Sequence, residues 1–164
     1  MIFVSVGTHN EQFNRLLEEL DRLVESKQIR DKIVAQTGYS TYKPKNYESF
    51  NFASWKKIIE LNKKAKVVIT HGGAGNLLTA SHFNKSIVAV PRLKKYEEHV
   101  NDHQLQLVTK LDKEKRVVGV YDINFLGSAI KKAKRFKIRK QSDSKEKLIV
   151  STVRSYIEKI VSEN

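Results

Sequence analysis

The chain has 164 residues, which is long enough for one domain with a hydrophobic core. It contains no cysteine, so neither a disulfide framework nor a thiolate metal site is available, and a reducing compartment fits. Its 31 lysines and arginines outnumber its 18 aspartates and glutamates, which favours an anionic partner: nucleic acid, an anionic membrane face or a phosphorylated substrate. The N-terminal residues lack the basic start of a signal peptide, and no stretch is long enough to span a bilayer. We therefore expect a cytoplasmic protein.

Short apolar runs alternate with segments of helical periodicity along the chain. The predicted strands cover residues 2–6, 32–37, 47–53, 67–70, 86–90 and 116–120. The predicted helices cover residues 11–24, 55–61, 76–83, 100–111 and 123–133, and Asn10 is expected to cap the first of them. Strands separated by helices imply βαβ units, so we expect an α/β fold: a Rossmann-like parallel sheet with helices on both faces.

A glycine-rich turn follows the strand at 67–70. It consists of His71 and the run Gly72-Gly73-Ala74-Gly75-Asn76, which can open a helix. A helix start presents free backbone N–H groups and the positive end of the helix dipole, and this arrangement binds anions such as phosphate. The turn is not a P-loop and lacks the spacing of dinucleotide-binding folds, so on its own it is also compatible with a plain strand-to-helix connection.

In open parallel sheets, ligands bind beyond the carboxyl ends of the strands. Three polar runs, 7–10, 71–76 and 91–104, follow predicted strands and should therefore meet at one edge. Four motifs stand in these runs or just before them, and a fifth ends the predicted strand at 32–37. They are Val4-Ser5-Val6-Gly7-Thr8-His9, Gln36-Thr37-Gly38-Tyr39-Ser40, Ile69-Thr70-His71-Gly72-Gly73, Val90-Pro91-Arg92, and Glu98-His99-Val100-Asn101-Asp102-His103-Gln104.

In the order and spacing of these motifs, residues 1–122 resemble the PssE-like subunits of bacterial polysaccharide-synthesising glycosyltransferases. The resemblance implies a glycosyltransferase family 28 C-terminal domain, the donor-binding half of a GT-B fold, similar to that half of MurG and to the catalytic subunit of the eukaryotic UDP-N-acetylglucosamine transferase. It implies a UDP-sugar donor, with no other cofactor, and inverting transfer of a hexosyl unit to a lipid-linked saccharide in polysaccharide biosynthesis. The acceptor-binding half would be a separate, membrane-anchored PssD-like subunit, which places this chain at the inner face of the cell membrane.

The residue chemistry is compatible with this reaction. A leaving UDP gains negative charge, which N–H dipoles and the guanidinium fork of Arg92 can stabilise. Glu98 is the best-placed general base, although it could equally orient His99 or Arg92. No Asp-x-Asp pair is present, so we expect no metal. We expect Glu98, His99 and His9 to be catalytic, and the substrate-binding residues to be Gly7, Thr8, His71, Gly72, Gly73, Ala74, Gly75, Asn76, Pro91, Arg92, Asp102, His103 and Gln104.

Structural roles remain open for several of these residues. Thr8 and His9 could only connect a strand to a helix, His71 could be a packing histidine, and 98–104 could be a capped helix start. Thr79 stands where MurG-like proteins have an acidic residue for the ribose hydroxyls, so the ribose should be held more weakly. Three aromatic side chains are expected to pack rather than to stack on a ligand: Tyr39, Tyr42 and Trp55.

The C-terminal segment, residues 134–164, is expected to lie outside the donor-binding domain of residues 1–133. Residues 131–140 are strongly basic and could be drawn to anionic lipid. From residue 145 onward, Ile149, Val153, Tyr156, Ile157 and Ile160 predict an amphipathic helix, which could pack on its own domain or dock on a partner.

Two other functions stay open. A sugar-nucleotide epimerase or hydrolase is one, because GT-B halves also serve those reactions, although such chains carry both halves in one polypeptide. A basic nucleic-acid-binding module is the other, but it is suggested by charge alone, and no nucleic-acid-binding motif is present. We therefore expect no nucleic-acid partner.

Overall fold

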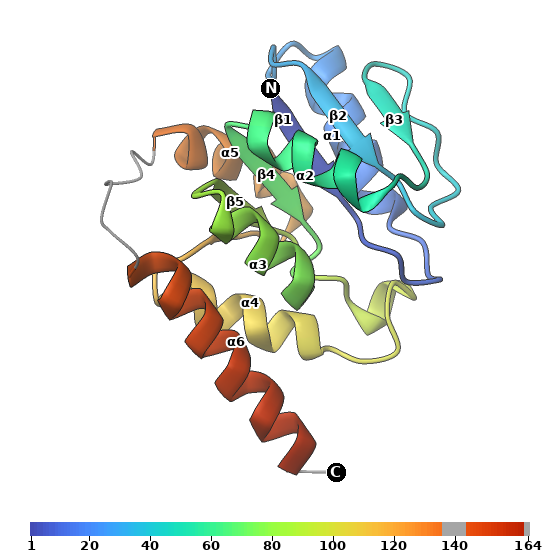
Figure 1. Ribbon diagram of the computed structural model, residues 1–164. Coiled ribbons are helices and arrows are strands. Elements are labelled where there is room, and N and C mark those ends of the chain that lie inside the picture. Colours follow the sequence, from blue (N-terminus) through green and yellow to red (C-terminus); the bar gives the residue numbers. More distant parts are fainter. Residues whose placement is uncertain (136–143, 163–164) are drawn as a thin grey trace.

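A computed structural model describes residues 1–135 and 144–162 of the chain. The described residues form a six-stranded parallel sheet in the order β3-β2-β1-β4-β5-β6 (Figure 1). The strands are β1 Ile2–Ser5, β2 Ile33–Gln36, β3 Glu48–Phe50, β4 Val67–Thr70, β5 Ser86–Ala89 and β6 Val118–Gly119. The predicted α/β fold with a parallel Rossmann-like sheet is therefore confirmed.

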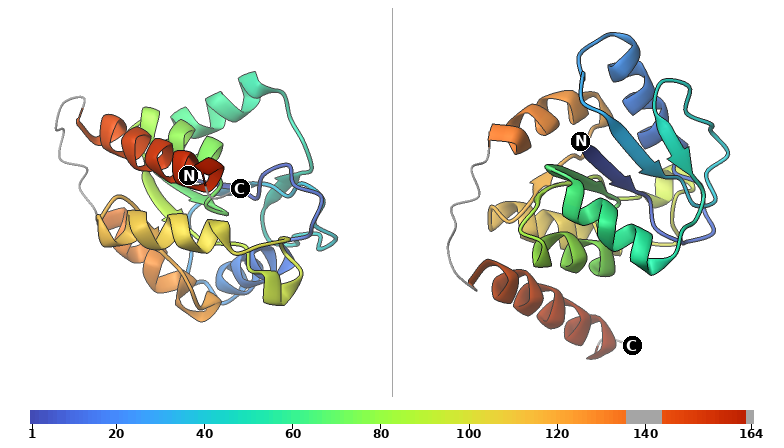
Figure 2. Two further views of the ribbon diagram at one scale, coloured as in Figure 1. Left: turned by 90° about the horizontal axis from the view of Figure 1, so that it is seen from below. Right: turned by 45° about the horizontal axis from the view of Figure 1, so that its top comes forward.

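Helices cover both faces of the sheet, as expected (Figure 2). They are α1 Asn14–Glu25, α2 Trp55–Lys64, α3 Ala74–His82, α4 His103–Lys113, α5 Leu126–Arg135 and α6 Ser144–Ser162, with short 3-10 turns η1 Lys94–Tyr96 and η2 Ile123–Phe125. Successive strand side chains point to opposite faces. Ile2 and Val4 therefore pack with α1 and α5, whereas Phe3, between them, packs with α2, α3 and α4.

The start of α1 differs from the prediction. The helix begins at Asn14 rather than after Asn10, and Phe13 is its cap residue without a side-chain cap hydrogen bond. The Asn14 side chain instead binds a second loop, because its Oδ1 accepts hydrogen bonds from the N–H groups of Thr41 and Tyr42. Residues 6–13 consequently form a longer loop at the carboxyl edge of the sheet.

Helix α6 packs on its own domain, against α3 and α4 (Figure 1). Ile149 and Val153 are buried in the same core as α3 and α4, and the Tyr156 hydroxyl donates to the carbonyl of His103 at 2.7 Å. Ile157 was expected on this buried stripe, but it is 48% exposed. Of the predicted basic run, residues 136–140 lie outside the described residues, as does the side chain of Ile160.

The strand order reverses between β1 and β4. The chain moves from β1 outward to β2 and β3 on one side, then returns to β4 and continues to β5 and β6 on the other. At such a switch point the connecting segments diverge, which leaves a crevice beyond the carboxyl ends of the two central strands. The loops after β1 and β4 border this crevice, so the sheet topology brings the predicted runs 7–10 and 71–76 together.

Candidate functional site

A cleft of about 500 Å³ lies at the carboxyl ends of β1, β2 and β4, beside the starts of α2 and α3. This volume is within the range of small-molecule sites. The cleft is at the switch point of the sheet, where a ligand is expected. Its lining residues are Gly7, Thr8, Gln36, Ala53, Trp55, Ile58, His71, Gly73, Ala74, Gly75 and Asn76.

The N-terminus of α3 forms one wall of the cleft. Gly73 precedes the helix in an extended conformation and provides no side-chain cap, and the first hydrogen bond of the helix runs from Leu77 N to the Gly73 carbonyl. Within the described residues, the N–H groups of Ala74, Gly75 and Asn76 therefore have no acceptor. Free N–H groups and the positive helix end attract an anion at this wall.

His71 is held between two glycines. A Cβ added at Gly7 would lie 2.6 Å from His71 Cε1, and one added at Gly73 would lie 2.3 Å from Nε2, so only glycine leaves room for the imidazole on either side. Gly7 also has φ +83°, a conformation that side chains disfavour. The ring is thus fixed beside the free N–H groups of α3.

The imidazole of His71 is neutral near pH 7. Burial, together with the nearby charge of Arg92, lowers the pKa of His71 to about 4, although the Nδ1 contact with the Ser5 carbonyl at 3.3 Å acts in the opposite direction. A neutral imidazole can donate or accept one hydrogen bond at Nε2, but it does not neutralise an anion. The groups at this wall that can receive an anion are therefore the backbone N–H groups.

One exposed aromatic side chain is among the residues that line the cleft. Trp55, the first residue of α2, is 66% exposed and lines the cleft. Tyr39 and Phe52, both exposed, meet edge to face with their ring centroids 5.0 Å apart. Tyr39 and Trp55 are thus exposed, and the prediction that they pack rather than stack on a ligand stays a prediction, whereas Tyr42 is half-buried and donates to Asp21. A flat ring could stack on this aromatic surface.

Arg92 is completely buried below the cleft edge. Its guanidinium lies 5.1 Å from the centre of the Phe13 ring. Burial lowers the pKa of Arg92 to about 10, although nearby Glu98 opposes this shift. The guanidinium donates, over 2.7–3.3 Å, to the backbone carbonyls of Val6, Glu11, Gln12 and Glu98.

Glu98 is also completely buried, and both of its carboxylate oxygens accept hydrogen bonds. Its carboxylate accepts two hydrogen bonds from Arg15, at 2.8 and 2.9 Å, and one from the N–H of Leu93 at 3.0 Å. Glu98 therefore has no exposed oxygen that could act as a general base, and Arg92 presents no guanidinium fork to the cleft. In this structure the two residues fasten the loop after β5 to the loop after β1.

Three of the predicted histidines, His9, His99 and His103, do not line the cleft, whereas His71 does. His9 and His99 stack with ring centroids 4.6 Å apart, and His9 pairs with Glu11. Burial, and to a lesser extent the neighbouring His9, lowers the pKa of His99. His103, the first residue of α4, is exposed.

The other predicted residues support the loop after β5. Asp102 Oδ1 accepts from Lys94 N at 3.0 Å, and Gln104 Oε1 accepts from Arg92 N at 3.2 Å. The Pro91 carbonyl accepts from Arg15, and Gly72 is buried against Val108. The cleft lining thus includes Gly7, Thr8, His71, Gly73, Ala74, Gly75 and Asn76, and does not include His9, Gly72, Pro91, Arg92, Glu98, His99, Asp102, His103 and Gln104.

Sequence reasoning missed Gln36, Ala53, Trp55 and Ile58 as cleft residues. Gln36 stands in a quoted motif and directly follows an apolar run, which is the pattern that identified Gly7 and His71. Ala53, Trp55 and Ile58 carry no comparable signal. They lie where the chain leaves β3, the edge strand, and enters α2.

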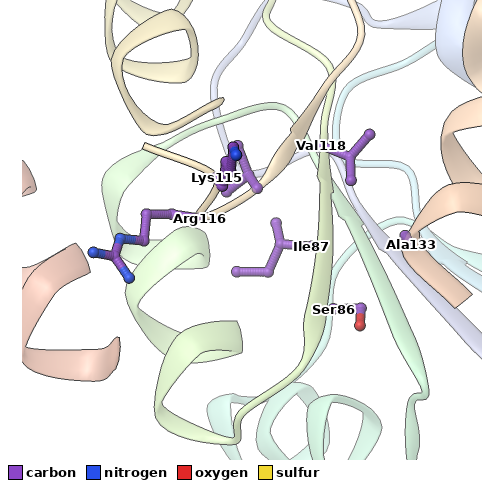
Figure 3. A pocket seen from close by; sticks show the side chains of 7 residues that line it. Ser86, Ile87, Lys115, Arg116, Val118 and Ala133 are labelled. Carbon is purple, nitrogen blue, oxygen red and sulfur yellow. The ribbon is translucent and has the colours of Figure 1, made fainter. Parts of the chain in front are cut away.

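A second cavity lies at the opposite edge of the sheet, beside the starts of β5 and β6 (Figure 3). Its volume of about 10 Å³ suits one water molecule at most. Figure 3 shows the guanidinium of Arg116 directed away from Ser86 and Ala133, so it does not point into this cavity. We therefore do not consider it a ligand site.

Comparisons with known proteins agree with this fold. Residues 1–160 match the glycosyltransferase family 28 C-terminal domain, while no curated protein sequence matches the chain. The calicheamicin glycosyltransferase CalG4 superposes with a TM-score of 0.61 at 14% identity, covering 97% of this chain and 43% of that chain. MurG of Acinetobacter baumannii superposes with a TM-score of 0.55 at 14% identity, covering 92% of this chain and 49% of that chain. The chain thus spans less than half the length of these two structures.

Proposed function

We propose that this chain, which belongs to the family of glycosyltransferase family 28 C-terminal domains, binds the nucleotide-sugar donor of a glycosyl transfer reaction. The observation that carries the proposal is the free N-terminus of α3 at the switch-point cleft. There the N–H groups of Ala74, Gly75 and Asn76 are available to a diphosphate. The resemblance to PssE-like subunits favours UDP as the nucleotide.

The same N–H groups suit the chemistry of transfer. When the sugar leaves the nucleotide, negative charge grows on the diphosphate, and fixed dipoles aimed at that charge stabilise it without reorganising. We propose that the diphosphate lies against α3 and that the aromatic surface at Trp55 contacts the flat base. With the proton of the neutral ring on Nδ1, toward the Ser5 carbonyl, His71 Nε2 would accept one hydrogen bond from a sugar hydroxyl. Arg92 and Glu98 would act indirectly, by holding the loop after β1 in place.

We further propose that a separate, PssD-like subunit supplies the acceptor-binding half and the membrane anchor, and that a hexosyl unit passes to a lipid-linked saccharide in polysaccharide biosynthesis. The sequence resemblance supports this arrangement. The site also needs a second wall, because the described residues leave the cleft open to solvent and catalysis requires that water be excluded. Within residues 1–135 and 144–162, no helix combines the length and apolarity needed to cross a membrane.

The exposed face of α5 supports a peripheral position at an anionic membrane. Ser128, Lys131, Lys132 and Arg135 line one open hollow on this helix, and Phe125 just before it is 65% exposed. Basic residues near an anionic bilayer contribute about 1 kcal/mol each. We propose that this face is drawn to the inner surface of the cell membrane in a salt-sensitive way.

Binding of UDP tests the donor site. A Cβ at Gly75 would meet nothing within 4 Å, so Gly75→Leu should keep the fold while placing a side chain where the diphosphate is proposed to lie. Calorimetry with wild-type protein should show UDP binding, Gly75→Leu should bind at least about tenfold more weakly, and the control Ser128→Leu on α5 should match wild type. Equal affinity of folded Gly75→Leu and wild type would overturn the site assignment.

A reconstituted assay tests the two-part arrangement. The purified chain would be mixed with UDP-sugar and lipid-linked acceptor, with and without membranes that contain the candidate partner. We expect transfer only in the mixture. Full transfer by the purified chain alone would refute the need for a partner, and release of free sugar without acceptor would favour a hydrolase instead.

A further inference from the structure

We propose that Ser5 is a positioning residue that fixes the orientation of two cleft amides, Gln36 and Asn76, so that they present complementary hydrogen-bonding groups to the ligand. The inference rests on the proposed function, because it takes the ligand to be a nucleotide-sugar donor. Gln36 and Asn76 both line the cleft, and Ser5 lies below them, 2% exposed.

The position of Ser5 follows from the strand order. Ser5 ends β1, which lies between β2 and β4, and it pairs with Gln36 in β2 on one side and with Thr70 in β4 on the other. Its hydroxyl donates to Gln36 Oε1 at 2.8 Å and accepts from Asn76 Nδ2 at 2.8 Å. One buried hydroxyl thus connects the end of β2 with the first turn of α3.

The hydroxyl of Ser5 has one proton, which sets the direction of this chain of hydrogen bonds. Because Ser5 gives its proton to the carbonyl oxygen of Gln36, the group that Gln36 has left for the cleft is its Nε2 amide, a donor. Because Asn76 gives an N–H to Ser5, the group that it has left is Oδ1, an acceptor.

Both of these groups are open to the cleft. Within the described residues, Gln36 Nε2 and Asn76 Oδ1 have no hydrogen-bond partner. The side-chain atoms that are both enclosed and unpartnered there are Asn62 Oδ1, Arg92 Nε and Arg116 Nε. The two amide groups are therefore unpartnered but not enclosed, as expected for groups that await a ligand.

This arrangement selects for ligand chemistry. Gln36 offers a donor to a phosphate or carbonyl oxygen, and Asn76 offers an acceptor to a hydroxyl beside the free N–H groups of α3. A nucleotide sugar carries both kinds of group close together. The hydrogen bonds of Ser5 are not needed to align the strands, because β1 and β2 are already joined by a backbone ladder and by the Val6 N–H to Gln36 carbonyl bond.

The experiment measures UDP affinity by calorimetry for wild type, Ser5→Ala, Gln36→Leu and the double variant, with unfolding by urea measured for each. We expect Gln36→Leu to bind UDP about tenfold more weakly and Ser5→Ala to lose at least as much, because Ser5→Ala also releases Asn76. The double variant should bind no more weakly than Ser5→Ala, because the Gln36 amide is already released in that variant. Ser5→Thr, which keeps the hydroxyl, should restore affinity. Ser86→Ala, a buried serine at the opposite sheet edge, should match wild type.

A charge variant tests the direction assigned to the amide. Gln36→Glu can still accept from Ser5, but it replaces the proposed donor with an anionic oxygen, so it should weaken UDP binding more than Gln36→Leu does. Binding by Gln36→Glu that equals or exceeds that of Gln36→Leu would overturn the orientation.

The remaining outcomes separate the two proposals. UDP binding by wild type that is unchanged in Ser5→Ala, or single losses that add in the double variant, would overturn the role of Ser5 and leave the donor site standing. Ser5→Thr that folds but binds no better than Ser5→Ala would also overturn it. Absence of UDP binding by wild type would overturn the proposed function and this inference with it.

Discussion

Two loops at the same edge of the sheet, residues 71–76 and residues 91–102, differ in whether their polar groups are free. Within the described residues, backbone N–H groups of the first loop are unpartnered at the cleft, whereas the side chains of Arg92 and Glu98 in the second are buried and hydrogen-bonded. Residues 71–76 contain no carboxylate and no lysine or arginine, yet they leave backbone N–H groups and the His71 ring at an open cleft. Residues 91–102 carry most of the charged residues of the predicted site, but Glu98 is enclosed and paired with Arg15, and Arg92 is enclosed and bound to backbone carbonyls. Residues 91–102 instead hold the loop after β1, which also borders the cleft.

The difference shows why a charged motif is weak evidence for catalysis. An ion pair that is removed from water must satisfy nearly all of its hydrogen-bonding groups within the protein. Glu98 does so with Arg15 and Leu93, and Arg92 does so largely with backbone carbonyls. Such residues are as constrained as catalytic ones, but what they stabilise is the shape of the site.

The largest expected effect on stability is that of a substitution at Glu98, in the loop of residues 91–102. Glu98→Gln removes the carboxylate charge that pairs with Arg15 and lies near Arg92, so it should lower the free energy of unfolding by about 3 kcal/mol. Urea unfolding would measure this, with Glu97→Gln, an exposed neighbour, as the matched control. Unchanged stability together with a large loss of turnover would restore Glu98 as a catalytic base and break the comparison.

In the loop of residues 71–76, alanine substitutions at two glycines should change stability in opposite directions. Gly73→Ala places a Cβ 2.3 Å from His71 Nε2 and should cost about 2 kcal/mol in stability through overpacking. Gly75→Ala meets nothing and should gain up to about 1 kcal/mol from helix propensity. Thermal unfolding of both variants compares them directly, and equal stabilities would show that the His71 ring is not confined by Gly73.

The pH dependence of stability sharpens the account of His71. Its folded pKa of about 4 lies below the ordinary value of 6.5, so between these values the unfolded state binds more protons. The contribution of His71 to the free energy of unfolding therefore has its full value above pH 6.5 and is lost as the pH falls toward 4. At pH 5 the free energy of unfolding should be lower by about 2 kcal/mol for this reason. Urea unfolding at pH 8 and pH 5 should show a smaller difference for His71→Gln than for wild type. The same difference in both proteins would mean that the ring is not buried in its neutral form.

The smallest effect on stability is expected at Gln104. This residue of α4 accepts a hydrogen bond from the N–H of Arg92, in the loop of residues 91–102. Gln104→Ala leaves the N–H of Arg92 without its side-chain acceptor and should cost about 1 kcal/mol. His103→Ala, its exposed neighbour, should change stability by less than about 0.5 kcal/mol. Chemical denaturation distinguishes the two, and equal costs would show that the Arg92–Gln104 contact contributes nothing.

Much of the fold was determined by the sequence alone. Continuous apolar runs of four or five residues, separated by segments with helical periodicity, can bury both faces only in a parallel sheet covered by helices. The glycine turn after β4 was recognisable from the sequence because the strand before it and the helix after it, which give the turn its geometry, are also its neighbours in the chain. Local chemistry likewise indicated Gly7 and Thr8, which directly follow an apolar strand.

Only the tertiary structure decided which polar residues face the cleft. Glu98 and Arg92 have the composition of a catalytic pair, but Arg15, 83 residues from Glu98 in the chain, folds against them and occupies the carboxylate. Ser5 and Gln36 are separated by 31 residues and meet because β1 and β2 are adjacent strands. Burial and hydrogen-bond partners are properties of pairs of distant segments, so the sequence could supply the candidate residues, whereas packing determined which of them remain free.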